Sequence, residues 1–330
     1  MGASDGDGLP LMVDSIETTS PQKPIRIGVL GAAGQLGSCL VREIEASDDA
    51  DLVFATTRDD FDFANPVDLD QWLDARLKGK QTRPLDVVIN AAAHTGVDAC
   101  ESEVELAYQI NALTPAEWAR VLAERDIRLI HVSTNYVFSG DVEHAYHEDD
   151  PTEPRTVYGK SKRAGEIAVL GTHENALVVR TSWVFGPGRN FVGAILEQAE
   201  ARRLGNTEGP LRVVNDQVGS PTSARDLAAA LVEICFHPND ATRKATGLLH
   251  LRNAEETTWF GFAQKILELG GYGELEIEPV SSSAFKTAAP RPAYSVLDCS
   301  KARDLGIEFR SWWEALASYL DERSEHGVQR

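Results

Sequence analysis

The sequence has few cysteines and no long apolar run, and each shortage argues against a class of protein. Its four cysteines lie far apart with no C-x-x-C pair, so we expect reduced thiols of a cytoplasmic protein, with neither a disulfide framework nor a metal site. No stretch approaches the length of a membrane span. Residues 1–24 hold one short apolar patch and no basic segment, which predicts a disordered tail and not a signal peptide.

Basic residues are also scarce, with 32 Lys and Arg against 51 Asp and Glu, and the formal net charge is −19. Binding to nucleic acid or to an anionic membrane is driven by a basic face, so we expect neither partner. A small anionic ligand stays compatible with this charge where basic residues gather locally. The hydrophobic content of 42% is that of a globular protein with a large core.

From residue 25 onward, short runs of apolar and β-branched residues alternate with longer helical patterns. Strands are expected at 25–30, 51–57, 85–93, 127–134 and 176–186, and helices at 34–47, 67–77, about 99–125 and 157–170. Continuous apolar strands separated by helices are typical of a parallel sheet that is covered on both faces. We therefore predict an α/β fold with a doubly wound parallel sheet of the Rossmann type.

Beyond residue 186 the alternation loosens, and the rest of the chain predicts a smaller C-terminal lobe. Helices are expected at 190–204, 224–236 and 312–322, around a Pro- and Ser-rich stretch at 272–300. The expected division is a tail at 1–24, an NAD(P)-binding domain at 25–185 and a substrate-binding lobe at 186–330, with some of its elements returning to the sheet.

Gly31, Gly34 and Gly37 end the first expected strand and open the first expected helix. Free N–H groups and the positive end of the dipole at a helix start bind a pyrophosphate. The spacing G-x-x-G-x-x-G favours the short-chain dehydrogenase/reductase type of Rossmann fold. A tight turn without a ligand is the alternative interpretation.

The end of the second strand is where an acid would bind the ribose of NAD, and here it holds Thr56, Thr57 and Arg58. Hydroxyls and a guanidinium suit the 2′-phosphate of NADPH, which a carboxylate would repel. Asp59 and Asp60 follow directly, so NADH stays possible, and Arg58 as a solvated loop residue is the alternative.

Tyr158 and Lys162 stand four residues apart on one helix, after a strand that ends in Ser133 and Thr134. Positions four apart are separated by about 40° around a helix, so Lys162 shares the face of Tyr158, whereas Lys160 lies on the other side. We expect the ammonium to lower the pKa of the phenol and to hold the nicotinamide ribose. Thr134 would polarise a substrate carbonyl, and Tyr158 would deliver a proton as hydride arrives from the nicotinamide.

Six blocks carry a resemblance to a known family: NAAAHTGVDACESE, STNYVF, VYGKSKRAGE, RTSWVFG, NDQVGSPT and RPAYSVLD, in this order. From about residue 25 to its end, the chain resembles the dTDP-4-dehydrorhamnose reductases, which are extended short-chain dehydrogenase/reductases. The resemblance implies NADPH-dependent reduction of the 4-keto group of dTDP-4-dehydro-L-rhamnose to dTDP-L-rhamnose, with a nucleotide-sugar substrate. We expect no metal, because no second ligand stands at a suitable spacing from His94.

The resemblance also implies roles for single residues. On the cofactor side they are Gly34, Gln35 and Leu36 along the pyrophosphate, Asp62 and Phe63 near the adenine, and Ala93, His94 and Thr95 beside the ribose and nicotinamide. On the substrate side they are Thr134 and Asn135, with Trp183 on the sugar ring and Arg291 at the diphosphate. The family usually has Asp at position 135, so Asn135 removes a charge there.

Several alternatives stay open at this point. His94 and Trp183 have ordinary core roles as their alternatives, and Asn111 either supports the lysine or caps a helix. The chain could also be a nucleotide-sugar epimerase or dehydratase that retains its NAD, or a non-catalytic NADP-binding subunit that resembles the beta subunit of methionine adenosyltransferase. The blocks NAAAHTGVDACESE and RTSWVFG favour the reductase because they are closer to the enzymes. Whether the chain forms a homodimer is open.

Overall fold

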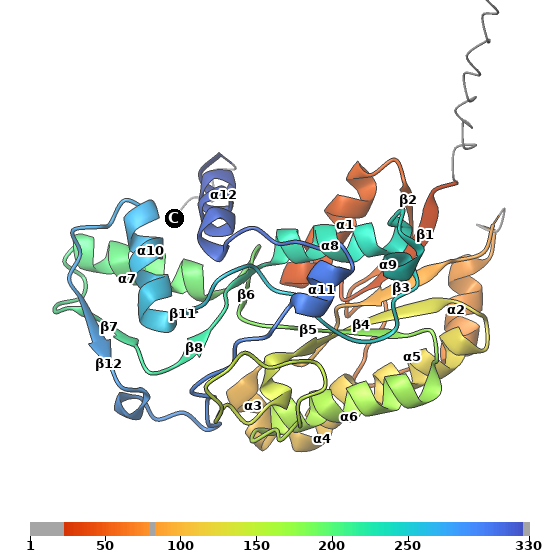
Figure 1. The fold of residues 1–330 in the computed structure, drawn as a ribbon, viewed down its shortest axis with the longest axis horizontal. Helices are drawn as coiled ribbons and strands as arrows, with labels where there is room; N and C mark the ends of the chain where they lie inside the picture. Colours follow the sequence, from red (N-terminus) through yellow and green to blue (C-terminus); the bar gives the residue numbers. More distant parts are fainter. Residues whose placement is uncertain (1–22, 80–82, 326–330) are drawn as a thin grey trace, which may run out of the picture.

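A parallel six-stranded sheet forms the centre of the computed structural model, which describes residues 23–79 and 83–325 (Figure 1). Its strands are β1 (Ile25–Leu30), β2 (Ala50–Thr56), β3 (Val87–Asn90), β4 (Arg128–Thr134), β5 (Leu177–Thr181) and β10 (Gly247–His250). They lie in the order β10-β5-β4-β3-β1-β2, and each neighbouring pair is parallel. Residues 1–22 of the predicted tail lie outside the described residues.

Helices cover both faces of the sheet because its strands are apolar on both sides. α1 (Gln35–Ala46) and α8 (Ala224–Phe236) share one hydrophobic core with the sheet. α2 (Leu69–Leu77), α5 (Thr114–Ala123) and α6 (Val157–Thr172) lie on the opposite face, where they bury a second core. The predicted α/β fold with a doubly wound, Rossmann-type sheet is confirmed.

A smaller lobe is built on one end of this sheet (Figure 1). It contains α7 (Phe191–Arg203), α10 (Trp259–Leu269), α12 (Trp312–Glu325) and the parallel pair β7 (Leu211–Val214) and β12 (Ile277–Val280). Phe185, Phe262 and Trp312 belong to the separate hydrophobic core of this lobe. α8 and β10 follow α7 in the sequence but pack with the sheet.

The strand expected at 176–186 is wrong in its second half. β5 ends at Thr181, and Val184–Phe185 form a separate strand, β6, which pairs with β9 (Thr222–Ser223) outside the main sheet. Trp183 at the break has a φ of 44°. This left-handed conformation does not occur within a regular strand, so the chain leaves the sheet at this residue.

The helix expected at about 99–125 is also interrupted. Its elements are α3 (Val97–Ser102), α4 (Val104–Tyr108), the π-helical turn η1 (Gln109–Leu113) and α5. Single π-helical turns inside helices are frequent at functional sites. This one holds Asn111, whose side chain is buried.

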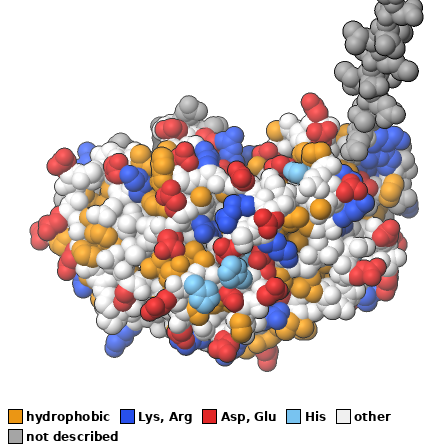
Figure 2. Space-filling view, in the orientation of Figure 1, with side chains coloured by type: hydrophobic (Ala, Val, Ile, Leu, Met, Phe, Trp, Pro, Cys, Tyr) orange, Lys and Arg blue, Asp and Glu red, His pale blue; other side chains and the backbone are white. Residues whose placement is uncertain are grey.

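The face drawn in Figure 2 carries acidic side chains across its whole extent, with Lys and Arg scattered among them. The surface in this view is therefore of mixed charge. Among the helices of the described residues, none is both long and apolar enough to cross a membrane.

Candidate active site

The order of the strands reverses between β1 and β3, and α/β proteins bind ligands at such a point. β2 lies on one side of β1, whereas β3, β4 and β5 extend to the other. The predicted cofactor residues follow the carboxyl ends of β1, β2 and β3, and Thr134 ends β4. The topology thus brings these segments to one edge of the sheet.

Gly31, Gly34 and Gly37 lie in and after one tight loop, and a larger residue does not fit at Gly31 or Gly37. Gly31 has a φ of 82°, and a Cβ there would lie 2.7 Å from the backbone nitrogen of Ala92. A Cβ at Gly37 would collide with the carbonyl oxygen of Gly31. Leu36 is buried beneath the loop. The bare backbone therefore packs closely and stays accessible to a ligand.

α1 begins at this loop without a side-chain cap. Gly34 occupies the N-cap position, whereas Thr156 caps α6 and Asn190 caps α7 with their side chains. The N–H groups of the first turn of α1 can therefore bind a pyrophosphate, which the helix dipole favours. Next to them, Gln35 donates from Nε2 to the carbonyl oxygen of Arg189 at 3.3 Å, which ties the loop to the start of the second lobe.

The end of β2 holds a paired acid, Asp60, and an exposed base, Arg58. Asp60 accepts hydrogen bonds from the backbone and hydroxyl of Thr57, both at 3.0 Å, and from Arg76 at 3.0 Å. These bonds, above all the backbone bond from Thr57, hold the pKa of Asp60 below its usual range. Arg58 is exposed and makes no hydrogen bond or ion pair with the described residues. Besides hydrogen bonds, the charge of Arg58 contributes to the lowered pKa of Asp62, and the exposed guanidinium of Arg58 suits the 2′-phosphate of NADPH.

Asp62 and Phe63 belong to the turn that follows. Asp62 accepts from the backbone of Ala64 at 2.9 Å and from the Asn65 amide at 3.0 Å. Phe63 is buried, and its ring meets that of Phe61 edge-on at 5.3 Å. The contacts of Asp62 and Phe63, the two residues predicted near the adenine, therefore stabilise this turn.

Ala93, His94 and Thr95 follow β3 and are held in place by Asn111. The backbone of His94 donates to Asn111 Oδ1 at 2.8 Å and accepts from Nδ2 at 3.1 Å. The His94 ring lies 2.7 Å from the carboxylate of Glu103. Ala93 and His94 are half-buried and Thr95 is exposed, so this segment borders the sheet edge with its backbone already fixed.

Asn111 also reaches α6, where Nδ2 donates to the Ser161 hydroxyl at 3.0 Å. Neither of the two roles expected for Asn111 describes this arrangement. Within the described residues its hydrogen bonds go to His94 and Ser161 and not to Lys162, so Asn111 joins the segment after β3 to the helix that carries Tyr158.

Tyr158 is 9% exposed, and its phenol lies close to the Thr134 hydroxyl, which favours the ionised form. Its ring meets that of Tyr136 edge-on at 5.5 Å. Burial raises the pKa of Tyr158 to about 12, which outweighs the lowering effect of the Thr134 hydroxyl. The expected lowering of this pKa by Lys162 is therefore wrong. The phenol is protonated at neutral pH and stands ready as a proton donor.

Lys162 lies on the buried face of α6, as its spacing from Tyr158 predicts, whereas Lys160 is exposed. Its Nζ donates to the carbonyl oxygen of Val132 at 2.7 Å and lies 3.3 Å from Nε2 of His131. Burial lowers the pKa of Lys162 to about 8, against the opposing attraction of Glu166. The ammonium and the amine thus both occur near neutral pH.

Glu166 lies one turn beyond Lys162 and is the centre of a buried ion network. It pairs with Arg180 of β5 through two hydrogen bonds of 2.9 and 2.8 Å. Ser133 donates to it at 2.6 Å, and Arg163 lies 3.4 Å away. The network fixes α6 against β4 and β5, directly beside Thr134.

Sequence reasoning missed His131, Glu166 and Arg180. Two observations pointed to them. Glu166 continues the interval of four from Tyr158 and Lys162, so it belongs to the same helix face. Arg180 and His131 are polar residues in strands that are otherwise apolar on both faces, where a polar side chain requires a partner.

Asn135, which stands where the family that the chain resembles usually has Asp, is 1% exposed. Its contacts explain why an amide fits at this position. Its Nδ2 donates to the carbonyl oxygen of Ser295 at 3.1 Å, and its Oδ1 lies 3.3 Å from the Thr134 hydroxyl. A carboxylate has no proton to donate to the Ser295 carbonyl. Asn135 therefore ties the end of β4 to the second lobe.

The two remaining predicted substrate residues have protein partners. Trp183 stacks on Trp259 of α10, with ring centroids 3.6 Å apart. Arg291 forms an ion pair with Asp98 of α3, at 2.6 and 3.1 Å, and donates to the Ala289 carbonyl. The structure does not bring Trp183 and Arg291 into contact with Tyr158 in the described residues.

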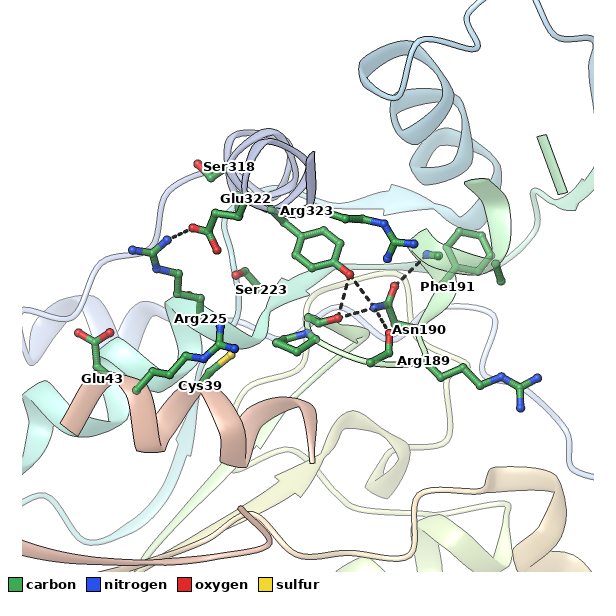
Figure 3. Close-up of a pocket in the computed structure, with 18 of the residues that line it drawn as sticks. Cys39, Glu43, Arg189, Asn190, Phe191, Ser223, Arg225, Ser318, Glu322 and Arg323 are labelled. Atoms are coloured by element: carbon green, nitrogen blue, oxygen red, sulfur yellow. Dashed lines mark hydrogen bonds and ion pairs between the residues drawn. The ribbon is translucent and has the colours of Figure 1, made fainter. Parts of the chain in front are cut away.

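A separate cavity of about 1290 Å³ opens between α1 and the second lobe (Figure 3). Glu43 of α1, Arg225 of α8 and Arg323 of α12 line it, and Arg225 forms an ion pair with Glu322. None of the predicted site residues lines this cavity in the described part of the chain. No group of three or more His, Cys, Asp or Glu side chains within residues 23–79 and 83–325 could hold a metal ion.

The sequence and the fold both match known proteins. The sequence pattern described as the RmlD substrate binding domain matches residues 25–325. The spore coat polysaccharide biosynthesis protein SpsK of Bacillus subtilis is 39% identical over 91% of this chain and 98% of its own. A dTDP-4-dehydrorhamnose reductase of Mycobacterium tuberculosis is 39% identical over 89% of this chain and 92% of its own.

Among solved structures, the dTDP-4-dehydrorhamnose reductase of Bacillus anthracis in complex with NADP superposes with a TM-score of 0.77. It is 32% identical to this chain, and the match covers 91% of this chain and 99% of the other. The similarity therefore includes both the sheet and the smaller lobe.

Proposed function

The chain belongs to the RmlD substrate binding domain family, and we propose that it reduces the 4-keto group of dTDP-4-dehydro-L-rhamnose to give dTDP-L-rhamnose. The cofactor is NADPH, in keeping with the NADP complex of the Bacillus anthracis relative. The protein is thus an oxidoreductase of nucleotide-sugar metabolism.

One observation carries the assignment to catalysis. Tyr158 is buried and protonated at neutral pH, and its phenol lies close to the Thr134 hydroxyl at the same sheet edge as the glycine loop. A subunit that only binds NADP has no need of a buried phenol with this partner.

The residues divide the work as follows. Gly34 and the first turn of α1 hold the pyrophosphate, and Arg58 holds the 2′-phosphate. When bound, NADPH supplies the hydride for the carbonyl carbon. Thr134 orients the carbonyl oxygen, and Tyr158 donates its proton to that oxygen as negative charge develops there. Lys162, one turn further along the same face of α6, would hold the nicotinamide ribose.

The test is a direct assay of the purified protein with dTDP-4-dehydro-L-rhamnose and NADPH, followed by loss of nicotinamide absorbance. We expect one NADPH to be oxidised for each dTDP-L-rhamnose formed. Tight NADP binding without oxidation would instead support a regulatory subunit. Sugar conversion without net NADPH consumption would support an epimerase.

We also propose a division into domains, a cellular compartment and a test of the oligomeric state. Residues 25–185 form the cofactor-binding domain and residues 186–330 contribute the substrate-binding lobe, which the separate core of the lobe supports. The cytoplasm is the compartment we propose, since NADPH-dependent biosynthesis takes place there and all four cysteines are free. A homodimer is the open alternative to a monomer, and the molar mass in solution distinguishes them.

A further inference from the structure

Asn90 and His131 are fully buried neighbours whose contacts fix the position of the ring proton. The backbone of Ala92 donates to Oδ1 of Asn90 at 3.0 Å, so the amide group of Asn90 points its Nδ2 the other way. Nδ2 lies 3.0 Å from Nδ1 of His131. An amide nitrogen only donates, so Nδ1 is the acceptor and the proton of the neutral ring is on Nε2.

The Nε2–H of His131 faces Lys162, whose Nζ is 3.3 Å away. An ammonium group has only donors, so Nε2–H cannot bond to it. A neutral amine has a lone pair that accepts this proton. The imidazole stays neutral, because burial and the charge of Lys162 keep the pKa of His131 well below its usual value. The contact is therefore a hydrogen bond only for the amine form of Lys162.

We propose that His131 is a positioning residue that fixes the Lys162 side chain and shifts its equilibrium from the ammonium toward the amine. The proposal rests on the proposed reductase function, in which Lys162 acts beside Tyr158. β3 pairs with β4 only as far as Asn90 and His131, and Lys162 bonds to the carbonyl of the next residue, Val132. His131 thus holds Nζ where the strand pairing ends.

Among the other groups packed around α6, none accounts for a shift of Lys162 toward the amine in the described residues. Glu166 on the same helix favours the ammonium, but both of its oxygens bind Arg180 of β5. From the remaining elements, the titratable groups Tyr136, Cys100 and Glu101 lie toward the Tyr158 end of the helix. Tyr136 and Cys100 act on the phenol, and Glu101 accepts from the backbone at the helix start. Asn111 and Ser133 are neutral. Burial and His131 therefore act together on Lys162.

The direct test is an NMR titration of side-chain-labelled lysines, in which the Lys162 signal is assigned by its loss in Lys162→Met. In wild type we expect a midpoint near the pKa of about 8. His131→Phe keeps the ring volume without the Nε2–H, and we expect the midpoint to rise by about one pH unit. His131→Gln can accept from Asn90 and donate to Nζ, as the ring does, and should restore the wild-type midpoint.

Asn90→Leu provides a second route if His131→Phe does not fold. Without the Asn90 donor the ring proton can move to Nδ1, and Nε2 can then accept from the ammonium, so the midpoint should again rise. An unchanged or lowered midpoint in both variants would overturn the proposal, as would a Gln variant that behaves like Phe. The titration needs no substrate, so it stands apart from the assay: inactive wild type would refute the reductase function and leave the His131 result intact. In active protein, the alkaline limb of kcat/KM should move with the midpoint.

Discussion

The two ends of one helix face differ in how completely their polar groups are paired. Tyr158, Lys162 and Glu166 follow one another at intervals of four along the buried side of α6. Glu166 is bound by Arg180, Ser133 and Arg163, and all its capacity is used within the protein. Tyr158 has the Thr134 hydroxyl as its polar partner.

The difference teaches how a single helix can serve both structure and chemistry. A buried carboxylate with a full set of partners is fixed in position. A buried phenol with one small partner keeps its proton and can pass it to a ligand. Lys162 lies between these ends and shares features of both. Its position is fixed by the bond to the Val132 carbonyl, whereas its pKa of about 8 allows both the ammonium and the amine near neutral pH.

The Tyr158 end predicts the largest effect on activity. Tyr158→Phe removes the proton donor and leaves the ring in place, so kcat should fall by about 10²–10⁴-fold. NADPH binding, measured by nicotinamide fluorescence, should change little because the cofactor contacts remain. Turnover at the wild-type rate would remove Tyr158 from the mechanism.

The Glu166 end predicts a loss of stability. Glu166→Leu leaves the Arg180 guanidinium, which is 1% exposed, without its carboxylate, and this should cost about 3–5 kcal/mol of unfolding free energy. Replacing both partners, with Glu166→Leu and Arg180→Met, should recover much of that loss. Urea unfolding gives both values.

A surface pair supplies the matched control for this second prediction. Lys265 and Glu268 form an ion pair on the exposed side of α10. Lys265→Ala should cost no more than about 1 kcal/mol, since exposed pairs contribute little. Equal losses from Lys265→Ala and Glu166→Leu would show that burial of the Glu166 network adds nothing.

The sequence predicted the Tyr158 end of this helix face but not the Glu166 end. The spacing of Tyr158 and Lys162 on a helix is local, and so is the periodic apolar pattern that predicts a helix at 224–236, where α8 lies. The pairing of Glu166 with Arg180 joins a helix to a strand, and no local pattern contains it. The pKa of Tyr158 was predicted in the wrong direction because charge was considered without burial.

The break between β5 and β6 has the same origin. Residues 176–186 are apolar and β-branched enough to predict a single strand, and local propensity gives no sign of an interruption. The break depends on β9, which pairs with Val184–Phe185, and on Trp259, which stacks on Trp183. Both partners come from the later part of the chain, so only the tertiary structure reveals them.

The end of β2 repeats the contrast on a smaller scale, because Asp60 accepts three hydrogen bonds whereas Arg58 is exposed and makes no hydrogen bond or ion pair with the described residues. Arg58→Ala should raise the KM for NADPH by about 10- to 100-fold, the effect of losing a charge-assisted bond to the 2′-phosphate. The KM for NADH should hardly change. Equal effects on both cofactors would show that Arg58 does not contact the phosphate.

The smallest effect is expected at Lys160, which shares the helix with Lys162 but not its face. Lys160 is exposed, and its side chain makes no hydrogen bond or ion pair with the described residues, so Lys160→Ala should change stability by no more than about 0.5 kcal/mol and kcat by less than twofold. Lys162→Met, in the same assay, should reduce kcat severely because it removes the amino group that would hold the nicotinamide ribose. The two lysines are two residues apart, and only Lys162 is buried. Comparing their variants therefore tests whether turnover depends on the buried position of the lysine or on any basic residue near the tyrosine. A comparable loss from both variants would favour charge alone and would contradict the contrast along this helix face.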